Sequence, residues 1–221
     1  MGLLTRRRAL LSAKGKTLLP KEYQQVEYLE STGTQYINTN VYPDTNTKVE
    51  IDMQIVSYRN VTAGYNFYIG TRNSNSTLGR FEFFFTAKTG WLTFNIGSTT
   101  YYRTIYDIQQ DFKRHLYTLD GISKKMIMDN SVLLSDMGEE SCSDWKTSDL
   151  PLRLFRETFN PTSLGGNMKM YNLKIYQANK LTNEYIPCYR KADNKAGLYD
   201  LVNGEFYTNQ GTGEFILGGE V

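Results

Sequence analysis

The residues of this chain best suited to acid–base chemistry form the segment Glu50-Ile51-Asp52-Met53-Gln54, in which polar and apolar side chains alternate. On a β-strand this spacing places Glu50, Asp52 and Gln54 on one face, because successive side chains point to opposite sides. Two carboxyl groups that flank a glycosidic bond, one as nucleophile and one as acid, can hydrolyse it. The third position here is an amide, which cannot donate a proton as an acid does or take it back as a base. Because the acid/base half of the pair is missing, we predict that the chain is not an enzyme.

Polar and aromatic side chains that face away from the core could still bind a saccharide. Two later segments alternate in the same way, and Trp91 is one of their outward residues. If these segments and residues 49–55 belong to one sheet, their outward side chains form one shallow face. An indole ring stacks on the CH face of a sugar, while carboxylates and amides bind its hydroxyl groups. The predicted carbohydrate-binding residues are Glu50, Asp52, Gln54, Phe84, Trp91 and Asn95, with Glu82 and Thr93 on the same face. The alternative is that a loop or a neighbouring subunit covers Trp91.

The residues that commonly bind metals are too few, or too poorly spaced, to predict a metal or a cofactor. Cys142, Cys188 and His115 cannot supply the four ligands of a zinc site. The two cysteines are expected to be buried free thiols, with a single disulfide bridge as the alternative. His115 has no nucleophile at a motif spacing, so a structural role is expected. Asp193-Asn194 could bind Ca²⁺ through oxygen atoms, but no fixed loop spacing supports such a site.

A short cluster at Tyr101-Tyr102-Arg103 has the residue types that protein–protein interfaces favour. We therefore predict a contact patch there. The alternative is that these side chains pack within the fold.

The first residues of the chain differ in charge from the rest. Residues 1–21 hold six basic groups and no acid, which leaves 19 basic and 23 acidic groups, a net charge of −4, for residues 22–221. A nucleic-acid-binding domain would carry its basic face on the folded body, so no nucleic-acid partner is expected. Only three apolar residues follow the arginines before Ser12, which is too few for a secretory signal. We predict that residues 1–19 are a basic helical or extended anchor that docks on a partner or a sister subunit; the alternative is a tail without order. The anchoring residues are Leu3, Leu4, Arg6, Arg7, Arg8, Leu10 and Leu11.

The remainder, residues 20–221, has the composition of an all-β domain. The whole chain of 221 residues contains 17 Tyr, 11 Phe and 18 Gly, and aromatic residues suit half-buried strands. Strand patterns at residues 49–55, 81–85, 92–96, 115–119, 125–128 and 168–176 alternate with turn signals, which is typical of a sandwich or barrel. No apolar run is long enough to span a membrane, so no membrane partner is expected.

Three stretches of the sequence resemble known families. Residues 114–133, RHLYTLDGISKKMIMDNSVL, are similar to the paired strands of laminin-G-like and concanavalin A-like lectin domains. Residues 19–41 (LPKEYQQVEYLESTGTQYINTNV) and 186–215 (IPCYRKADNKAGLYDLVNGEFYTNQGTGEF) resemble virion proteins of phages and prophages of gut bacteria. The resemblance covers about residues 19–217. It implies an antiparallel concanavalin A-like β-sandwich, or jelly roll.

The same resemblance implies a non-enzymatic protein on the surface of a phage particle, as a tail, baseplate, head-fibre or decoration component that can bind host or mucosal glycans. Its N-terminal segment would contact other virion proteins, and its body would form a homo-oligomer, with a trimer as the first expectation. A bacterial carbohydrate-binding module or adhesin is the alternative function. A glycoside hydrolase is a remote one, because some concanavalin A-like folds hydrolyse glycans.

Overall fold

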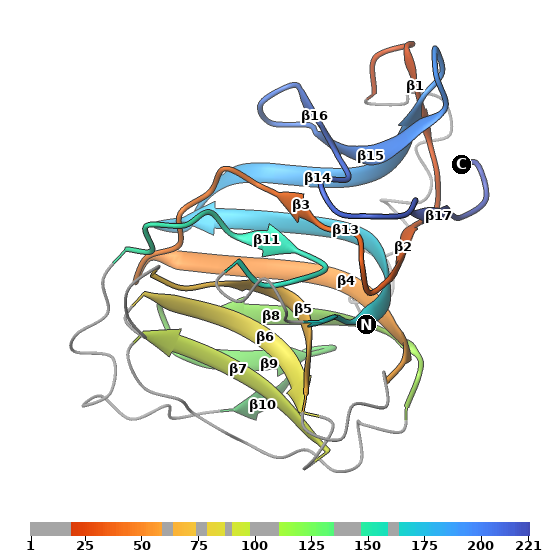
Figure 1. The fold of residues 1–221 in the computed structure, drawn as a ribbon. Helices are drawn as coiled ribbons and strands as arrows, with labels where there is room; N and C mark the ends of the chain where they lie inside the picture. The colour runs from red at the N-terminus through yellow and green to blue at the C-terminus, as the bar shows by residue number, and fades with distance from the viewer. Residues whose placement is uncertain are drawn as a thin grey trace, which may run out of the picture.

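The computed structural model describes residues 19–58, 64–73, 79–86, 90–97, 111–134, 147–158 and 164–221. All regular structure within these ranges is β-strand, and none of it is helix. The strands form two sheets that pack face to face around one hydrophobic core (Figure 1). The predicted all-β sandwich is therefore confirmed at this level. Several predicted residues lie outside the described ranges: Leu3, Leu4, Arg6, Arg7, Arg8, Leu10, Leu11, Tyr101, Tyr102, Arg103 and Cys142.

The larger sheet has eleven strands. Its main path runs in the order β10 (Ser131–Leu134), β9 (Lys125–Met128), β8 (Arg114–Asp120), β4 (Thr47–Ser57), β13 (Asn167–Gln177), β14 (Lys180–Arg190), β15 (Lys195–Asp200) and β16 (Glu205–Thr208). Three short strands join it at one end: β1 (Tyr23–Gln25), β2 (Leu29–Thr32) and β17 (Ile216–Leu217). All of its described pairings are antiparallel, and β4 and β13, which pair along most of their length, form the centre of the sheet.

The smaller sheet has six strands. Its order is β3 (Ile37–Asn38), β11 (Arg153–Leu154), β5 (Tyr65–Thr71), β6 (Arg80–Thr86) and β7 (Trp91–Gly97), with β12 (Leu164–Gly165) parallel to β5. Strands β5, β6 and β7 follow one another along the chain and pair antiparallel. Figure 1 shows this sheet in front of β4, β8 and β9 of the larger sheet.

The sandwich forms because apolar side chains occupy every second position of its central strands. On β4 the residues Val49, Ile51 and Met53 are fully buried, while the side chains between them are partly exposed. On β6 and β7 the predicted inward residues, Phe81, Phe83, Phe85, Leu92, Phe94 and Ile96, all lie in the core. Burying each of these side chains stabilises the fold by about 1.5–3 kcal/mol before the entropy cost.

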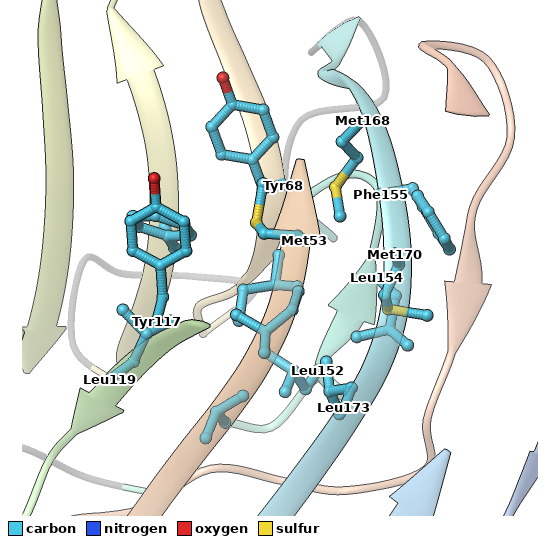
Figure 2. Close-up of a cluster of buried hydrophobic side chains, with 14 of the residues drawn as sticks. Met53, Tyr68, Tyr117, Leu119, Leu152, Leu154, Phe155, Met168, Met170 and Leu173 are labelled. Carbon is cyan, nitrogen blue, oxygen red and sulfur yellow. The ribbon is translucent and has the colours of Figure 1, made fainter. Parts of the chain in front are cut away.

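The core combines aromatic rings from both sheets with methionines of the larger one (Figure 2). The Phe83 ring of β6 packs against Tyr117 of β8, with 5.1 Å between the ring centroids. Met53, Met168 and Met170 are fully buried in the same core. Burial raises the pKa of the Tyr68 hydroxyl well above its ordinary value, because an anion in this apolar setting would be strongly disfavoured.

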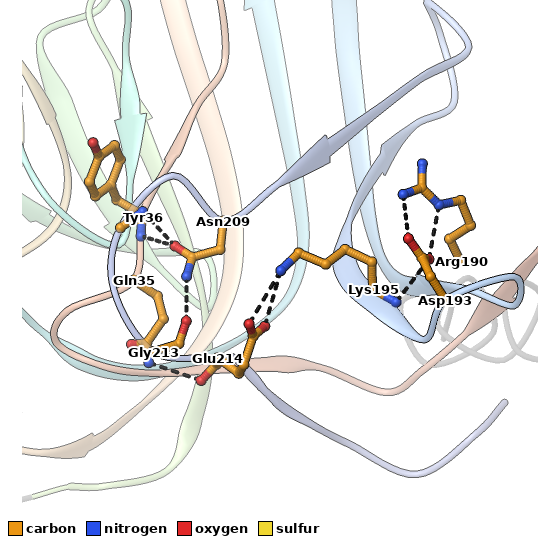
Figure 3. A network of polar contacts seen from close by, with 9 residues as sticks. Gln35, Tyr36, Arg190, Asp193, Lys195, Asn209, Gly213 and Glu214 are labelled. Atoms are coloured by element: carbon orange, nitrogen blue, oxygen red, sulfur yellow. Dashed lines mark hydrogen bonds and ion pairs between the residues drawn. The ribbon is translucent and has the colours of Figure 1, made fainter.

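Residues 31–36 and 209–214, which we term the clasp, connect two segments that lie far apart in the sequence by polar contacts (Figure 3). The side-chain oxygen of Asn209 accepts hydrogen bonds from the backbone N–H groups of Tyr36 and Gly211, and its amide nitrogen donates to Gly213 O at 2.7 Å. Gln35 is buried, and it accepts a hydrogen bond from the Thr32 N–H at 2.9 Å and donates to Glu214 O at 2.9 Å. The clasp therefore holds residues 209–214 against residues 31–36.

Candidate functional site

A line of polar positions crosses the outer face of the smaller sheet from edge to edge. Strand register aligns Asn38 of β3 with Arg153 of β11, Arg153 with Gly70 of β5, Gly70 with Glu82 of β6, and Glu82 with Asn95 of β7. Their neighbours along each strand are core residues, so these positions face outward. We term the side chains of Asn38, Arg153, Glu157, Glu82 and Asn95 the polar row.

Glu157 takes the central place in this row, because Gly70 has no side chain there. A Cβ atom on Gly70 would lie only 2.9 Å from Cβ of Glu157. Arg72 lies between the two buried carboxylates, with Nε 3.7 Å from Glu82 Oε1 and 3.9 Å from Glu157 Oε2. On the other side, Asn95 Nδ2 donates a hydrogen bond of 3.0 Å to Glu82 Oε2. Glu82 is therefore held in place by a cation on one side and an amide on the other.

Several oxygen atoms at the β6–β7 end of the row are buried without a hydrogen bond. Glu82, Thr93 and Asn95 are at most 3% exposed. Among the residues that the structure describes, none forms a hydrogen bond with Glu82 Oε1, Thr93 Oγ1 or Asn95 Oδ1. Burial raises the pKa of the Glu82 carboxyl, although Asn95 and Arg72 act in the opposite direction. A buried polar atom left unpaired costs about 1–3 kcal/mol, so these oxygens are candidates for contact with a ligand.

Aromatic side chains lie beside this end of the row. Phe67 and Phe84 face each other across β5 and β6, with ring centroids 4.9 Å apart. Tyr65 packs edge-on against Phe84 at 5.2 Å and is 47% exposed. Trp91 of β7, which is partly exposed, occupies the same outer face as Thr93 and Asn95. Thus three of the predicted carbohydrate-binding residues, Phe84, Trp91 and Asn95, are brought together with Glu82 and Thr93.

Arg153 lies near the opposite end of the row, on β11. Its Nε donates to Asn38 Oδ1 at 2.9 Å, its Nη1 donates to the Glu157 backbone carbonyl at 3.0 Å, and its guanidinium group stacks 4.0 Å from the centre of the Tyr36 ring. Asn38 in turn donates to Gln210 Oε1 of the clasp at 2.6 Å. Partial burial lowers the pKa of Arg153, but a guanidinium group remains charged in water at neutral pH. This end of the row is rich in donors, whereas the β6–β7 end is rich in acceptors.

The expectation that all eight predicted residues share one face is wrong. Glu50, Asp52 and Gln54 lie on β4 of the larger sheet, and Glu82, Phe84, Trp91, Thr93 and Asn95 lie on β6 and β7 of the smaller one. The alternation within each strand was read correctly, but pairing between distant strands decides which sheet each strand joins. The single groove that the sequence predicted across these strands therefore does not form.

On the larger sheet, the three polar residues of β4 are engaged by their own neighbours. Both oxygens of Asp52 accept hydrogen bonds of 2.8 Å from Arg114, whose guanidinium group also stacks on Tyr171 at 3.7 Å. Tyr171 donates to Gln54 Oε1 at 3.1 Å. Glu50 receives a hydrogen bond of 3.0 Å from the Tyr176 hydroxyl and lies 3.3 Å from Lys48. Because these groups satisfy one another, this face offers little to a ligand.

The remaining candidate groups have local partners. His115 Nδ1 lies 2.7 Å from Asp129 Oδ2, and its Nε2 lies 3.5 Å from Asp111 Oδ2, at the end of the core. Cys188 is a buried free thiol, and burial raises its pKa to about 12, which makes it a poor nucleophile. Asp193 accepts hydrogen bonds of 3.0 and 2.6 Å from Arg190, which lowers the Asp193 pKa to about 2. Its carboxylate thus serves an ion pair (Figure 3).

Sequence reasoning missed Asn38, Arg72, Arg153 and Glu157. Strands β3 and β11 are two residues long, so they carry no alternating pattern that a sequence could display. Arg72 and Glu157 follow the ends of β5 and β11, and only the folded arrangement brings them to Glu82. The single available signal was Gly70, since a glycine inside a strand often marks a close approach of another segment.

The described residues contain no group of three or more His, Cys, Asp or Glu side chains arranged to hold a metal ion. The part of the chain that the structure describes also has no helix that could cross a membrane. These residues define an all-β protein with two sheets and a polar and aromatic outer face on the smaller one. No protein-family model, no curated protein and no solved structure matches this chain.

Proposed function

We propose that this chain is a non-enzymatic saccharide-binding protein, and that the ligand binds on the outer face of the smaller sheet. The observation that carries the proposal is a set of buried oxygens on Glu82, Thr93 and Asn95 that form no hydrogen bond within the described residues, together with the aromatic side chains of Phe84 and Trp91. Sugar hydroxyl groups donate to such oxygens, while aromatic rings pack against the CH groups of a sugar ring. A ligand that reaches this face would donate hydrogen bonds to oxygens that accept none from the described residues.

Binding is favoured over hydrolysis because the two buried carboxylates are neutralised by the protein. Arg72 lies close to both Glu82 and Glu157, and Asn95 donates to Glu82. On the larger sheet, both oxygens of Asp52 are taken by Arg114. Neither face therefore combines an unpaired nucleophilic carboxylate with a separate proton donor, as glycoside hydrolysis requires.

The particular setting we propose is the surface of a phage particle, with the body folded as a concanavalin A-like jelly roll. Support comes from the likeness of residues 19–41 and 186–215 to phage virion proteins and from the two-sheet β architecture. Residues 1–19 would attach the body to other virion proteins, and several copies in a homo-oligomer would bind glycans with avidity from individually weak contacts.

The first experiment screens the full chain on a glycan array and compares Glu82→Gln and Trp91→Ala with Glu50→Gln. The first two variants change the proposed face, and the third makes a matched change on the outer face of the larger sheet. We expect binding to fall at least about tenfold in Glu82→Gln, because a hydrogen bond to a charged group contributes about 1.5–3 kcal/mol. Glu50→Gln should bind like the original chain. Thermal melting checks that each variant is folded.

Equal losses in Glu82→Gln and Glu50→Gln, or the absence of any glycan binding, would overturn the proposed site. Cleavage of an arrayed glycan would overturn the non-enzymatic reading. For the setting, the chain should co-purify with phage particles, and deletion of residues 1–16 should abolish its incorporation. A glycan-binding chain that never joins a particle would instead be a bacterial module or adhesin.

A further inference from the structure

One asparagine of this chain is directly followed by a glycine, and the pair lies in the turn between β15 and β16. Asn203-Gly204 is the single Asn-Gly step in the 221 residues. A glycine has no Cβ to hinder its backbone nitrogen, which can therefore reach the side-chain carbonyl carbon of the asparagine before it. Asn203 is also exposed, so water has access to it. These two features favour deamidation of Asn203.

Deamidation replaces the side-chain amide with a carboxylate and consumes water. The Gly204 nitrogen attacks the side-chain carbonyl carbon of Asn203 and forms a C–N bond, and the amide nitrogen leaves as ammonia with the proton of the Gly204 N–H. Water then breaks a C–N bond of the resulting succinimide ring, at either carbonyl carbon, and gives aspartate or isoaspartate. The side chain therefore loses both of its N–H donors and gains a negative charge.

The Asn203 side chain uses these two donors to join its turn to neighbouring strands. Its Nδ2 atom donates to Asp200 Oδ2 at 2.7 Å and to Thr182 O of β14 at 3.0 Å. Asp200 is fully buried, and it also accepts hydrogen bonds from Asn183 Nδ2 at 2.7 Å and from the Glu184 N–H at 3.1 Å. The amide of Asn203 thus fastens the β15–β16 turn to β14, both directly and through the Asp200 carboxylate.

The folded turn opposes the reaction that the sequence favours. Its hydrogen bonds hold the Asn203 amide toward Asp200 and Thr182, and the Gly204 N–H donates to Asp200 O at 2.9 Å. The Gly204 nitrogen has to lose that proton and approach the amide carbon, so the turn must open first. Local opening of an exposed turn requires less free energy than global unfolding. The rate of deamidation is therefore set by how often this turn opens.

We propose that Asn203 is a modification site, at which spontaneous deamidation releases the β15–β16 turn irreversibly. The product carboxylate cannot donate to Thr182 O or to Asp200, and its charge is repelled by the Asp200 carboxylate. Isoaspartate carries the same charge and adds a carbon atom to the backbone, next to the pair that Asp200 forms with Glu205. The modified turn therefore opens more readily than the original one. This site is independent of the proposed saccharide-binding face.

The first test is a time course of the full chain at mildly alkaline pH, in buffer and in guanidinium chloride, followed by peptide mapping with mass spectrometry. The mass gain of deamidation should appear first at Asn203 in both solutions. It should be at least about tenfold faster in guanidinium chloride, because an opening free energy of about 1.4 kcal/mol already gives that factor. Earlier conversion of another asparagine, or equal rates in the two solutions, would overturn the proposal.

The second test compares Asn203→Asp, which is the aspartate product, with Asn194→Asp. Asn194 is exposed in the turn between β14 and β15, so it provides the same change of charge in a different turn. Hydrogen exchange of the Gly204 amide should be at least about tenfold faster in Asn203→Asp, because a hydrogen bond to a charged group contributes at least that factor. Asn194→Asp should exchange like the original chain.

Unchanged exchange of Gly204 in Asn203→Asp would overturn the release of the turn. The first test uses the original chain, so it decides the question even if Asn203→Asp does not fold.

Discussion

The clasp and the polar row are both built from polar side chains, but they differ in how fully the protein satisfies them. In the clasp, each polar atom of the Gln35 and Asn209 side-chain amides has a hydrogen-bond partner. In the polar row, Glu82 Oε1 and Asn95 Oδ1 have none among the described residues, although both side chains are buried. Protein interiors rarely leave buried polar atoms unpaired. A complete network stabilises the fold, whereas an incomplete one leaves buried acceptors to which a ligand can donate.

The strongest way to break this comparison is to disrupt the clasp. Gln35→Ala removes a buried amide and leaves the Thr32 N–H and the Glu214 carbonyl without partners. We expect the free energy of unfolding to fall by about 3 kcal/mol, measured by urea denaturation. Gln210→Ala is the control, because that exposed side chain accepts one hydrogen bond from Asn38, and its loss should cost less than about 1 kcal/mol. Equal effects of the two substitutions would contradict a structural role for the clasp.

Two matched threonine substitutions, one in each kind of environment, should change the stability of the fold in opposite directions. Thr93 and Thr39 are both buried, but Thr39 Oγ1 donates to Leu152 O at 2.8 Å, whereas Thr93 Oγ1 forms no hydrogen bond within the described ranges. Valine has nearly the same shape without the hydroxyl group. We expect Thr39→Val to destabilise the fold by about 1–2 kcal/mol and Thr93→Val to stabilise it by about 1 kcal/mol. Thermal unfolding of both variants checks the signs, and a loss of stability in Thr93→Val would show that this hydroxyl is paired after all.

The burial of Glu82 should also make the stability of the fold depend on pH, with a smaller effect. Burial raises the folded-state pKa of Glu82 above its ordinary value of 4.5, so the folded chain binds more protons than the unfolded one just above that pH. Stability is therefore lost as the pH rises from 4.5 through the folded pKa. Glu82→Gln cannot titrate and should lose less stability over this interval in urea denaturation between pH 4 and 7. Parallel pH profiles for the two proteins would mean that Glu82 is ionised as readily as in water.

The smallest effect is expected on the larger sheet. Asp52→Asn removes a charge from the exposed pair with Arg114, and exposed pairs of this kind contribute about 0–1 kcal/mol. Stability should change by less than about 1 kcal/mol, and saccharide binding should not change. A large loss of saccharide binding, measured by calorimetry, would mean that the saccharide binds the larger sheet instead.

The local structure of this chain could be predicted from its sequence, whereas the assembly of its sheets could not. Alternation correctly identified the core-facing residues of β4, β6 and β7. Only β4 is buried on one face, whereas on β6 and β7 the residues expected to face outward, such as Glu82 and Asn95, are buried as well. The partner of each strand depends on contacts between distant residues, such as β4 with β13. For this reason the expectation that Glu50, Asp52 and Gln54 share a face with residues of β6 and β7 was wrong. The two-residue strands β3 and β11, which supply Asn38 and Arg153, have no readable pattern at all.

The segments on which the expected phage resemblance rests have chiefly structural roles in the described residues. Residues 31–36 and 209–214, which lie within two of those segments, form the clasp (Figure 3). Asp200, in the same C-terminal segment, accepts hydrogen bonds from Asn183, Asn203 and the Glu184 N–H. Such residues therefore report on the fold, while most of the candidate site, including Glu82, Asn95 and Arg153, lies outside those segments.

The most direct test of the account is nuclear magnetic resonance mapping of the bound saccharide. The isotope-labelled full chain is titrated with the tightest-binding saccharide of the array, and the backbone and side-chain amide shifts are followed. We predict that the largest changes fall on β6 and β7, including the side-chain amide of Asn95, while β4 and the clasp residue Gln35 stay nearly unchanged. Chemical-shift changes concentrated on β4 around Glu50 and Asp52 would contradict the claim that the saccharide binds the outer face of the smaller sheet.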